Sequence, residues 1–391
     1  MISFNNTEIA FQYKSDKDLK RAKKLFQLVG KRGLVKIGQK IVPIALKLRL
    51  PITGIIKRTV FKQFVGGESM NECDGTINAL FKYGVGTILD YSIEGQNEEE
   101  DFDTTKEEIK ATIIKAKDNL AIPFGVFKPT GVARFDLLAV FNDPKAVPTD
   151  AEKAEFSRTI TRIDEICSFA HAHNVPIFID AEHSWIQDTI DRIVESMMAK
   201  YNKEKCIIYN TYQMYRHDRL SYLKKSIENA KQGGYFYGAK LVRGAYMEIE
   251  RERAHKEGYP SPIYPNKSET DAAFNSAVEL MIQEIEITSI CCGTHNEESS
   301  QLLVDLIEKY NLDKNDSRIY FAQLLGMSDH ISFNLAHHGY NVAKYVPYGP
   351  VKEVTPYLLR RAEENTSVAG QTGRELNLIS KELKRRQNAK N

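Results

Sequence analysis

The sequence contains no uninterrupted apolar run of the roughly 18 residues that a membrane-spanning helix needs. Its N-terminus, MISFNNTEIAFQYKSDKD, lacks the basic start and apolar core of a secretory signal, and it is not an Arg/Ser-rich, acid-poor mitochondrial leader. Cysteine is scarce, and the five cysteines are odd in number and form no CxxC pair. A reducing cytoplasm fits this pattern better than a disulfide framework, so we expect a cytoplasmic protein.

The common phosphate and metal motifs are also missing. There is no GxGxxG or P-loop pattern, and Gly233-Gly234 precedes an expected strand, where it predicts a turn. No HxH pair lies on an expected strand, and the adjacent Cys291 and Cys292 are predicted to be packing residues. This spacing argues against a catalytic metal. One alternative stays open, a metal site built from Asp180, Glu182, His183 and His295.

Acidic residues are absent from one long stretch. Thirteen Lys and Arg, and no Asp or Glu, lie between Lys20 and Lys62, whereas the rest of the chain carries 41 basic and 52 acidic residues. Pro43, Pro51 and Gly54 predict short helices here rather than one. We expect residues 1–82 to form a basic helical arm that packs on the rest of the protein or binds an anionic membrane. Nucleic acid is not expected, because aromatic interleaving and binding motifs are missing.

From about residue 83, short apolar runs alternate with amphipathic stretches, such as those at 155–173 and 270–286. This alternation is typical of a parallel α/β sheet. Eight such units predict a (βα)8 barrel over residues 83–391. The strand candidates lie at 85–93, 122–129, 175–182, 205–213, 236–246, 289–295, 318–325 and 342–349.

Polar or charged residues stand at the carboxyl end of almost every expected strand, where this fold carries its catalytic groups. Such groups are costly inside a barrel unless they are paired or bind a ligand. Lys128 or Lys240 could serve as the Schiff-base lysine of a lyase or aldolase, which is one alternative function. A membrane-binding protein without enzymatic activity is another. The strand-end residues are Glu94, Lys128, Asp180, Glu182, Asn210, Gln213, Lys240, Arg243, Thr294, His295, Gln323 and Tyr345.

The segment after the eighth expected strand predicts a helix over 353–366. On it Tyr357, Arg360, Arg361 and Glu364 fall on one face. Two adjacent arginines beside a tyrosine make a fork that suits a carboxylate. The alternative is an exposed helix face held together by salt bridges.

Several motifs in order now point to a family. LDYSIE, KLVRGAY, FAQLLGMSD, YVPYG and YLLRRAEEN, spread from about residue 83 to 368, together resemble the proline dehydrogenase family. The resemblance implies a distorted (βα)8 barrel that binds FAD non-covalently, with the last helix lying over the barrel top. It also implies oxidation of L-proline to Δ1-pyrroline-5-carboxylate by hydride transfer to flavin N5, the first step of proline catabolism to glutamate.

The resemblance also implies roles for individual residues. Lys128, Arg360 and Arg361 would hold the proline carboxylate, Asp180 would lie beside that lysine, and Glu94 would form a gate with Arg360. The expected catalytic residues are Lys128, Asp180, Tyr345, Arg360 and Arg361. The residues expected to enclose the proline ring are Ala245, Tyr246, Leu325, Tyr345 and Tyr357.

For the cofactor, the resemblance implies that Gly244 lets the backbone approach the flavin ring. Lys240 replaces an arginine of many bacterial members, and Asn210 replaces a glutamine of the bifunctional enzymes. The loop at 260–270 departs further, so its contacts stay unassigned. The expected FAD-binding residues are Asn210, Lys240, Val242, Gly244, Thr294, His295 and Glu364.

The resemblance finally implies partners. Quinone is the family's usual electron acceptor, which would suit an enzyme held peripherally on the inner face of the cell membrane. The product would pass to a separate pyrroline-5-carboxylate dehydrogenase.

Overall fold

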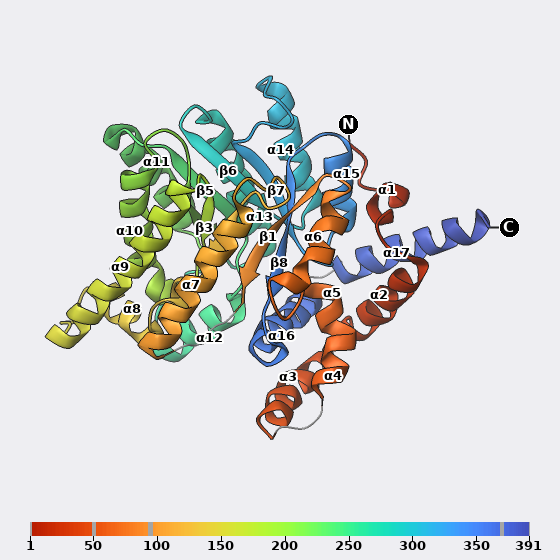
Figure 1. The fold of residues 1–391 in the computed structure, drawn as a ribbon, viewed down its shortest axis with the longest axis horizontal. Coiled ribbons are helices and arrows are strands. Elements are labelled where there is room, and N and C mark those ends of the chain that lie inside the picture. The colour runs from red at the N-terminus through yellow and green to blue at the C-terminus, as the bar shows by residue number, and fades with distance from the viewer. Residues whose placement is uncertain (1, 49–51, 93–96, 368–370, 391) are drawn as a thin grey trace. The chain divides into compact units, whose positions relative to one another are not determined.

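The computed structural model describes residues 2–48, 52–92, 97–367 and 371–390, with the backbone alone at several helical positions. Eight strands alternate with helices along the chain (Figure 1). They follow the order β1-β8-β7-β6-β5-β4-β3-β2 in one sheet. Strand β1 pairs in parallel with β8, and each strand from β2 to β6 pairs in parallel with the next strand along the chain. This is the predicted TIM-like (βα)8 class.

Each predicted strand is present, although the strands are shorter than the apolar runs that predicted them. The runs also include the residues that lead into and out of each strand. The strands are β1 (Val85–Tyr91), β2 (Gly125–Phe127), β3 (Ile177–Ile179), β4 (Ile208–Gln213), β5 (Tyr237–Val242), β6 (Thr288–Gly293), β7 (Ile319–Leu324) and β8 (Val342–Tyr348).

Contacts divide the chain into two compact units, which are described separately below. Unit 1 consists of Met1–Ser92 and Gln323–Asn391, and unit 2 of Ile93–Ala322. The division falls inside β7, not at the predicted boundary between residues 82 and 83. Unit 1 therefore combines the beginning and the end of the chain.

Unit 2 carries most of the sheet. One face of the sheet bears a group of packed aromatic rings, Phe124, Phe178, Tyr209 and Tyr320, with centroids 4.3–5.6 Å apart. The opposite face is covered by helices, as in other parallel sheets. These helices and the shorter ones of the unit are α7 (Glu99–Ala116), η3 (Pro129–Gly131), α8 (Phe135–Asn142), α9 (Asp150–Ala172), α10 (Ser184–Tyr201), α11 (Arg219–Gly233), α12 (Met247–Glu257), α13 (Lys267–Gln283) and α14 (Glu297–Lys309).

Local sequence signals explain where several of these helices begin and end. The Thr149 side chain accepts a bond from the Glu152 backbone N–H, and Glu152 accepts one in return, which forms a capping box at the start of α9. Helix α11 ends at Gly233 and is followed by Gly234 as its C-cap, whose φ of +61° suits glycine. The turn predicted at Gly233-Gly234 is thereby confirmed.

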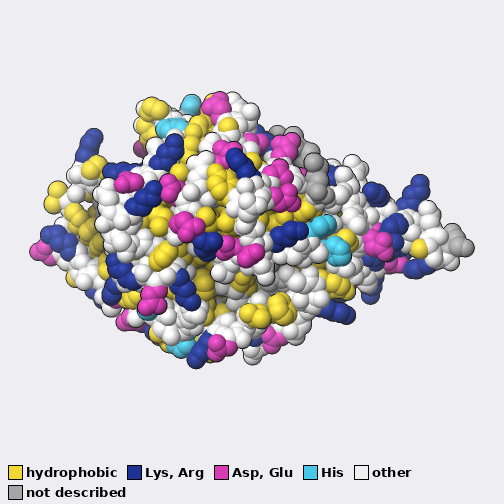
Figure 2. Space-filling view, turned by 90° about the horizontal axis from the view of Figure 1, so that it is seen from above, with side chains coloured by type: hydrophobic (Ala, Val, Ile, Leu, Met, Phe, Trp, Pro, Cys, Tyr) yellow, Lys and Arg dark blue, Asp and Glu magenta, His cyan; other side chains and the backbone are white. Residues whose placement is uncertain are grey.

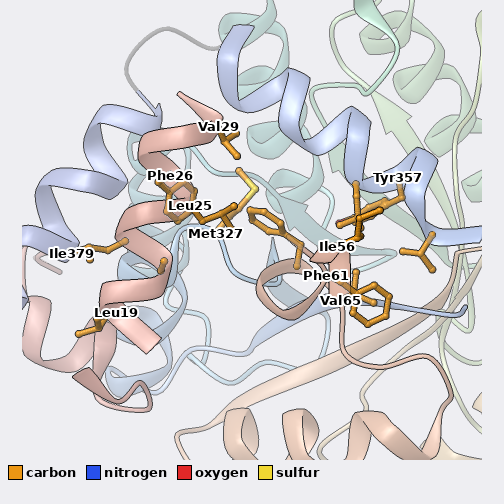
Figure 3. Packing of buried hydrophobic residues seen from close by; sticks show 14 of the residues in the cluster. Leu19, Leu25, Phe26, Val29, Ile56, Phe61, Val65, Met327, Tyr357 and Ile379 are labelled. Carbon is orange, nitrogen blue, oxygen red and sulfur yellow. The ribbon is translucent and has the colours of Figure 1, made fainter. Parts of the chain in front are cut away.

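Unit 1 joins the N-terminal arm to the last helices. A single buried cluster, here called the arm cluster, connects them, and in Figure 3 Phe61 and Ile56 lie close to Tyr357. The arm cluster comprises Ala10, Phe11, Leu19, Ala22, Leu25, Phe26, Val29, Ile56, Phe61, Phe64, Val65, Met327, Val351, Val354, Tyr357, Leu358, Leu378 and Ile379. The helices of the unit are α1 (Thr7–Phe11), α2 (Asp16–Val29), α3 (Arg32–Lys47), α4 (Thr53–Ile56), η1 (Lys57–Phe61), α5 (Lys62–Phe64), η2 (Asn71–Cys73), α6 (Asp74–Phe81), α15 (Asp329–His337), α16 (Val351–Ser367) and α17 (Gln371–Asn388).

One prediction about the arm is wrong. Helix α3 runs without a break through Pro43, where the sequence predicted an interruption. A proline ring fixes φ near the helical value and removes one hydrogen bond, so it weakens a helix without always ending it. Packing of α3 against α16 and α2 supplies tertiary support that local sequence does not reveal.

Charged side chains of both signs are interspersed on the surface that Figure 2 displays. Among the residues that the structure describes, no helix combines the length and the apolarity needed to span a bilayer.

Candidate functional site

In unit 2 the sheet brings several predicted residues to the carboxyl ends of neighbouring strands. Thr211 on β4 is in register with Lys240 on β5, and Lys240 with Cys291 on β6. The Lys240 ammonium lies 5.1 Å from the centre of the Phe178 ring and donates to Asp180 Oδ1. Only 7% of the Lys240 side chain and 13% of the Asp180 side chain are exposed, so this is a largely desolvated ion pair.

Lys128 follows β2 directly and is half-buried. The backbone N–H of Asp180 donates to the carbonyl of Phe127 at 2.9 Å, which ties the end of β3 to the residue before Lys128. The structure thus brings the Lys128 and Asp180 backbones together, as their predicted shared role requires.

Asn210 points away from these groups. Its amide donates to Asp191 Oδ1 on α10 at 2.9 Å, and its carbonyl oxygen accepts from the Thr211 backbone N–H at 2.9 Å. Asp191 also accepts from Arg219 at 2.6 Å. Because side chains alternate along a strand, Thr211 and Gln213 lie on the face of Lys240 and Asn210 on the other. The flavin contact of Asn210 stays a prediction, and Thr211 and Gln213 are the residues of β4 that face the ring-bearing side.

From the sequence, Gln213 has no predicted role and Glu182 only a place in the alternative metal site, yet both hold the neighbouring loops in place. Gln213 donates to the Glu182 carbonyl at 2.6 Å and accepts from the Ala245 N–H at 3.1 Å. The Glu182 carboxylate accepts from the backbone N–H and the hydroxyl of Thr130, at 2.9 and 2.6 Å. Their places at strand ends were visible in the sequence, but their partners, far along the chain, were not.

Gly244 has a φ of +139°, a conformation that other residues rarely adopt. A Cβ atom built there would lie 2.6 Å from the Tyr215 ring. The approach that requires glycine in this structure is therefore that of Tyr215, and the predicted approach of a flavin ring stays a prediction. Nearby Tyr246 is buried, and its ring lies 4.2 Å from that of His183.

Arg243 organises the end of β6. It donates to Asp271 at 2.7 Å, to the Thr294 hydroxyl at 2.6 Å and to the Ser299 hydroxyl at 3.0 Å. Thr294 is buried, and the adjacent His295 is half-buried. Val242, the last residue of β5, is also half-buried. Among the described residues, no group of three or more His, Cys, Asp or Glu could hold a metal ion. Burial raises the pKa of Cys291 to about 12, which suits a packing residue.

In unit 1, Leu325 and Tyr345 are joined through the backbone. The Leu325 N–H donates to the Tyr345 carbonyl at 2.9 Å, so the end of β7 is fixed against β8. Leu325 is buried and Tyr345 half-buried.

Helix α16 carries the predicted carboxylate fork. Tyr357 is buried in the arm cluster, and the Arg361 guanidinium lies 5.2 Å from the centre of its ring. Arg360 and Arg361 are both half-buried, unlike the fully exposed arginines of a solvated helix face. Glu94 and the Glu364 side chain lie outside the described residues.

The donor set of unit 2 fits a bound FAD. Thr211 Oγ1 is buried without a hydrogen-bond partner in the described part of the chain, next to Lys240 in register. A buried hydroxyl in this position has a donor available for a ligand, since such groups are rarely left unpaired. The neighbouring Lys240 ammonium, which is paired with Asp180, is a cation of the kind that stabilises negative charge on an electron-accepting ring.

The family model for proline dehydrogenase matches residues 73–374. The chain belongs to the proline dehydrogenase family. It is 36% identical to proline dehydrogenase 1 of Dictyostelium discoideum over 87% of this chain and 67% of that protein. It is 30% identical to hydroxyproline dehydrogenase of Xenopus laevis over 98% of this chain and 90% of that protein. As a member of this family, it is an oxidoreductase.

The fold agrees with solved structures. Proline utilization A from Bdellovibrio bacteriovorus superimposes with a TM-score of 0.72 at 19% identity, over 93% of this chain and 38% of that one. At this identity the likeness establishes the fold alone. The chain spans well under half of that larger protein.

Proposed function

We propose that this proline dehydrogenase family member uses FAD to oxidise L-proline to Δ1-pyrroline-5-carboxylate. The observation that carries the proposal is the family match over residues 73–374, a range that contains every residue expected to contact substrate or flavin. When bound, FAD would supply the electron acceptor and take a hydride at N5. Quinone is the proposed final acceptor, and a separate pyrroline-5-carboxylate dehydrogenase would consume the product.

The protein's own residues would bind and orient proline. By the family's pattern, Lys128, Arg360 and Arg361 hold the carboxylate, and charge-assisted bonds of this kind fix both position and direction. Tyr345 and Leu325 would pack on the ring. Proline would react with a neutral amine, because a hydride does not leave readily from a carbon beside an ammonium. Since the motifs contain no obvious base, the proton is expected to leave to solvent.

The experiment that tests this function is a visible absorption spectrum of the purified protein before and after anaerobic addition of L-proline. We expect a yellow protein whose flavin bands bleach, and whose flavin is released as FAD by acid precipitation. A colourless protein that borohydride traps with a keto acid would instead support the Schiff-base alternative. FMN, or a pellet that stays yellow, would contradict non-covalent FAD.

Substrate preference gives a sharper prediction. Tyr345 occupies the position where hydroxyproline-oxidising relatives carry a smaller residue, so its ring is expected to crowd a 4-hydroxyl group. We expect higher kcat/KM for L-proline than for trans-4-hydroxy-L-proline, and Tyr345→Ser should narrow the gap by about tenfold. A wild-type preference for hydroxyproline would contradict the substrate assignment and leave the fold unaffected.

The arm has a surface that suits an anionic membrane. Ile37, Ile41, Ile44 and Leu48 are between 55% and 66% exposed, and their spacing of four, three and four residues places them on one face of α3 and its continuation. Val35 and Val42 pack against the arm cluster instead. This exposed apolar stripe lies within residues 20–62, which contain thirteen Lys and Arg and no acidic residue. Such a combination is typical of interfacial helices.

We therefore expect the protein to pellet with anionic liposomes and not with neutral ones, and high salt should weaken the binding. Ile41→Glu/Ile44→Glu should abolish it. A matched control is Ile114→Glu/Leu120→Glu, which changes two apolar residues of unit 2 that are at least half exposed. Equal loss in both variants, or no dependence on lipid charge, would contradict docking through α3. Deleting the arm is unsuitable, because its other residues form the arm cluster with α16 and α17.

A further inference from the structure

The turn between β7 and α15, residues Leu325–Ser328, has an unusual backbone. Gly326 has a φ of +77°, and Ser328 a φ of +50°, which is uncommon for a residue with a side chain. A Cβ atom on Gly326 would lie 2.1 Å from the Gln63 carbonyl oxygen. Such a conformation costs free energy and persists only where the surroundings impose it.

Three buried side chains from distant parts of unit 1 impose it. Gln63 of α5 donates to the Gly326 carbonyl at 2.9 Å. Lys344 of β8 donates to the Met327 carbonyl at 2.5 Å and to the Leu324 carbonyl at 3.4 Å. Glu375 of α17 accepts from the Ser328 N–H at 2.5 Å. Together they bind the backbone at four positions, of which Leu324, Gly326 and Met327 accept and Ser328 donates, with Leu325 among them bonded to Tyr345.

Two of these side chains, Lys344 and Glu375, are ionisable and buried. Burying a charged group costs free energy unless it is paired and hydrogen-bonded, so their partners need to be identified. The Lys344 side chain is 0% exposed and lies 3.0 Å from Asp329 Oδ1. Burial alone would raise the pKa of Asp329, but Lys14 and Lys344 outweigh it and hold that pKa well below its usual range. Lys14 and Tyr13 donate to the same carboxylate at 2.6 and 2.9 Å. The charges around the turn are therefore compensated within unit 1.

We infer that Glu375, Lys344 and Gln63 are positioning residues that fix the Leu325–Ser328 turn, and through it the wall that Leu325 presents to the substrate ring. The inference rests on the proposed function, because Leu325 is expected to enclose proline. The N–H of Leu325 donates to the Tyr345 carbonyl. Lys344, the residue before Tyr345, binds the Leu324 carbonyl just before the turn and the Met327 carbonyl within it. The three side chains therefore act on two substrate-facing residues at once.

The test compares Glu375→Leu with Glu375→Gln in the full-length, FAD-loaded protein. The leucine removes the acceptor for the Ser328 N–H, whereas the glutamine keeps an oxygen there. We expect Glu375→Leu to raise KM for L-proline about tenfold, the size of losing one bond to a charged group, with a smaller change in kcat. It should also narrow the preference for L-proline over its six-membered homologue, L-pipecolate. Glu375→Gln should restore both.

Glu382→Leu is the matched control, since Glu382 lies on the same helix, is fully buried and binds Arg385 and Arg386 rather than the turn. It should reduce thermal stability without changing ring-size preference. If Glu375→Leu keeps the wild-type KM and preference, or if Glu382→Leu changes them equally, the positioning role is wrong. Failure of the wild-type protein to oxidise proline would instead overturn the proposed function, so the two outcomes are separable.

Discussion

Replacing Arg360 or Arg361 by methionine is expected to lower kcat/KM for L-proline by roughly 30–1000-fold while FAD stays bound. The reason is that each variant removes a charged hydrogen bond to a carboxylate in a site shielded from water, a loss of about 2–4 kcal/mol. Steady-state kinetics measure the effect, and the ratio of flavin to protein absorbance shows whether cofactor binding survives.

Arg385→Met provides a control for a generic loss of positive charge. Arg385 lies on α17 and binds Glu382, away from the predicted fork. Its kcat/KM should equal that of the wild type. Wild-type kcat/KM in both Arg360→Met and Arg361→Met would remove the carboxylate fork from the mechanism, and α16 would then be the salt-bridged helix that the sequence left open.

The second large effect concerns stability. Lys240→Met leaves the largely buried Asp180 without this cation, and breaking such a pair typically costs about 3–5 kcal/mol. We expect urea unfolding of the flavin-free protein to show that the free energy of unfolding falls by this amount. The variant should also lose proline turnover, because Lys240 is the cation expected beside the flavin.

A second substitution separates the structural role of the pair from its chemical role. Lys240→Met/Asp180→Asn removes both charges, so most of the unfolding free energy should return while turnover stays absent. Lys240→Arg, which keeps the charge, should be nearly as stable as the wild type. If the double variant is as unstable as the single one, the ion pair is not the cause of the loss.

The fold could be predicted from the sequence because its main signal is local. Each buried strand is a short apolar run between polar segments, and all eight runs, from Val85 to Tyr348, became strands. The prediction at Pro43 was wrong because the packing that supports α3 comes from α16, about 300 residues later. Helix propensity reflects an average over many environments and does not include the packing at this particular position.

The candidate site was only partly predictable for a similar reason. Strand-end position marked Lys240 and Asp180 as separate candidates, and Asp180 was expected beside Lys128. It did not predict the ion pair that Asp180 makes with Lys240 in the structure. Strand position alone did not reveal that Asn210 points toward α10 and Thr211 toward the ring-bearing face. The motif FAQLLGMSD contains the turn after β7 but served only to indicate the family. The residues that support the turn, Gln63 and Glu375, lie far away in sequence and are visible only in three dimensions.

The make-up of unit 1 also has a consequence for biosynthesis. Helix α2 packs on α17, and Arg386 donates to the carbonyls of Phe11 and Lys14, so the first helices acquire their partners only when the last ones exist. The end of α2 and the end of α17 are about 350 residues apart, so at ribosomal rates of about 5–20 residues per second α2 stays without this partner for about 18–70 s. During that interval the buried face of α2 has no α17 to pack against. Nascent chains stalled before residue 371 should therefore be captured by chaperones that bind apolar segments. Full-length chains that have been released from the ribosome should not be captured.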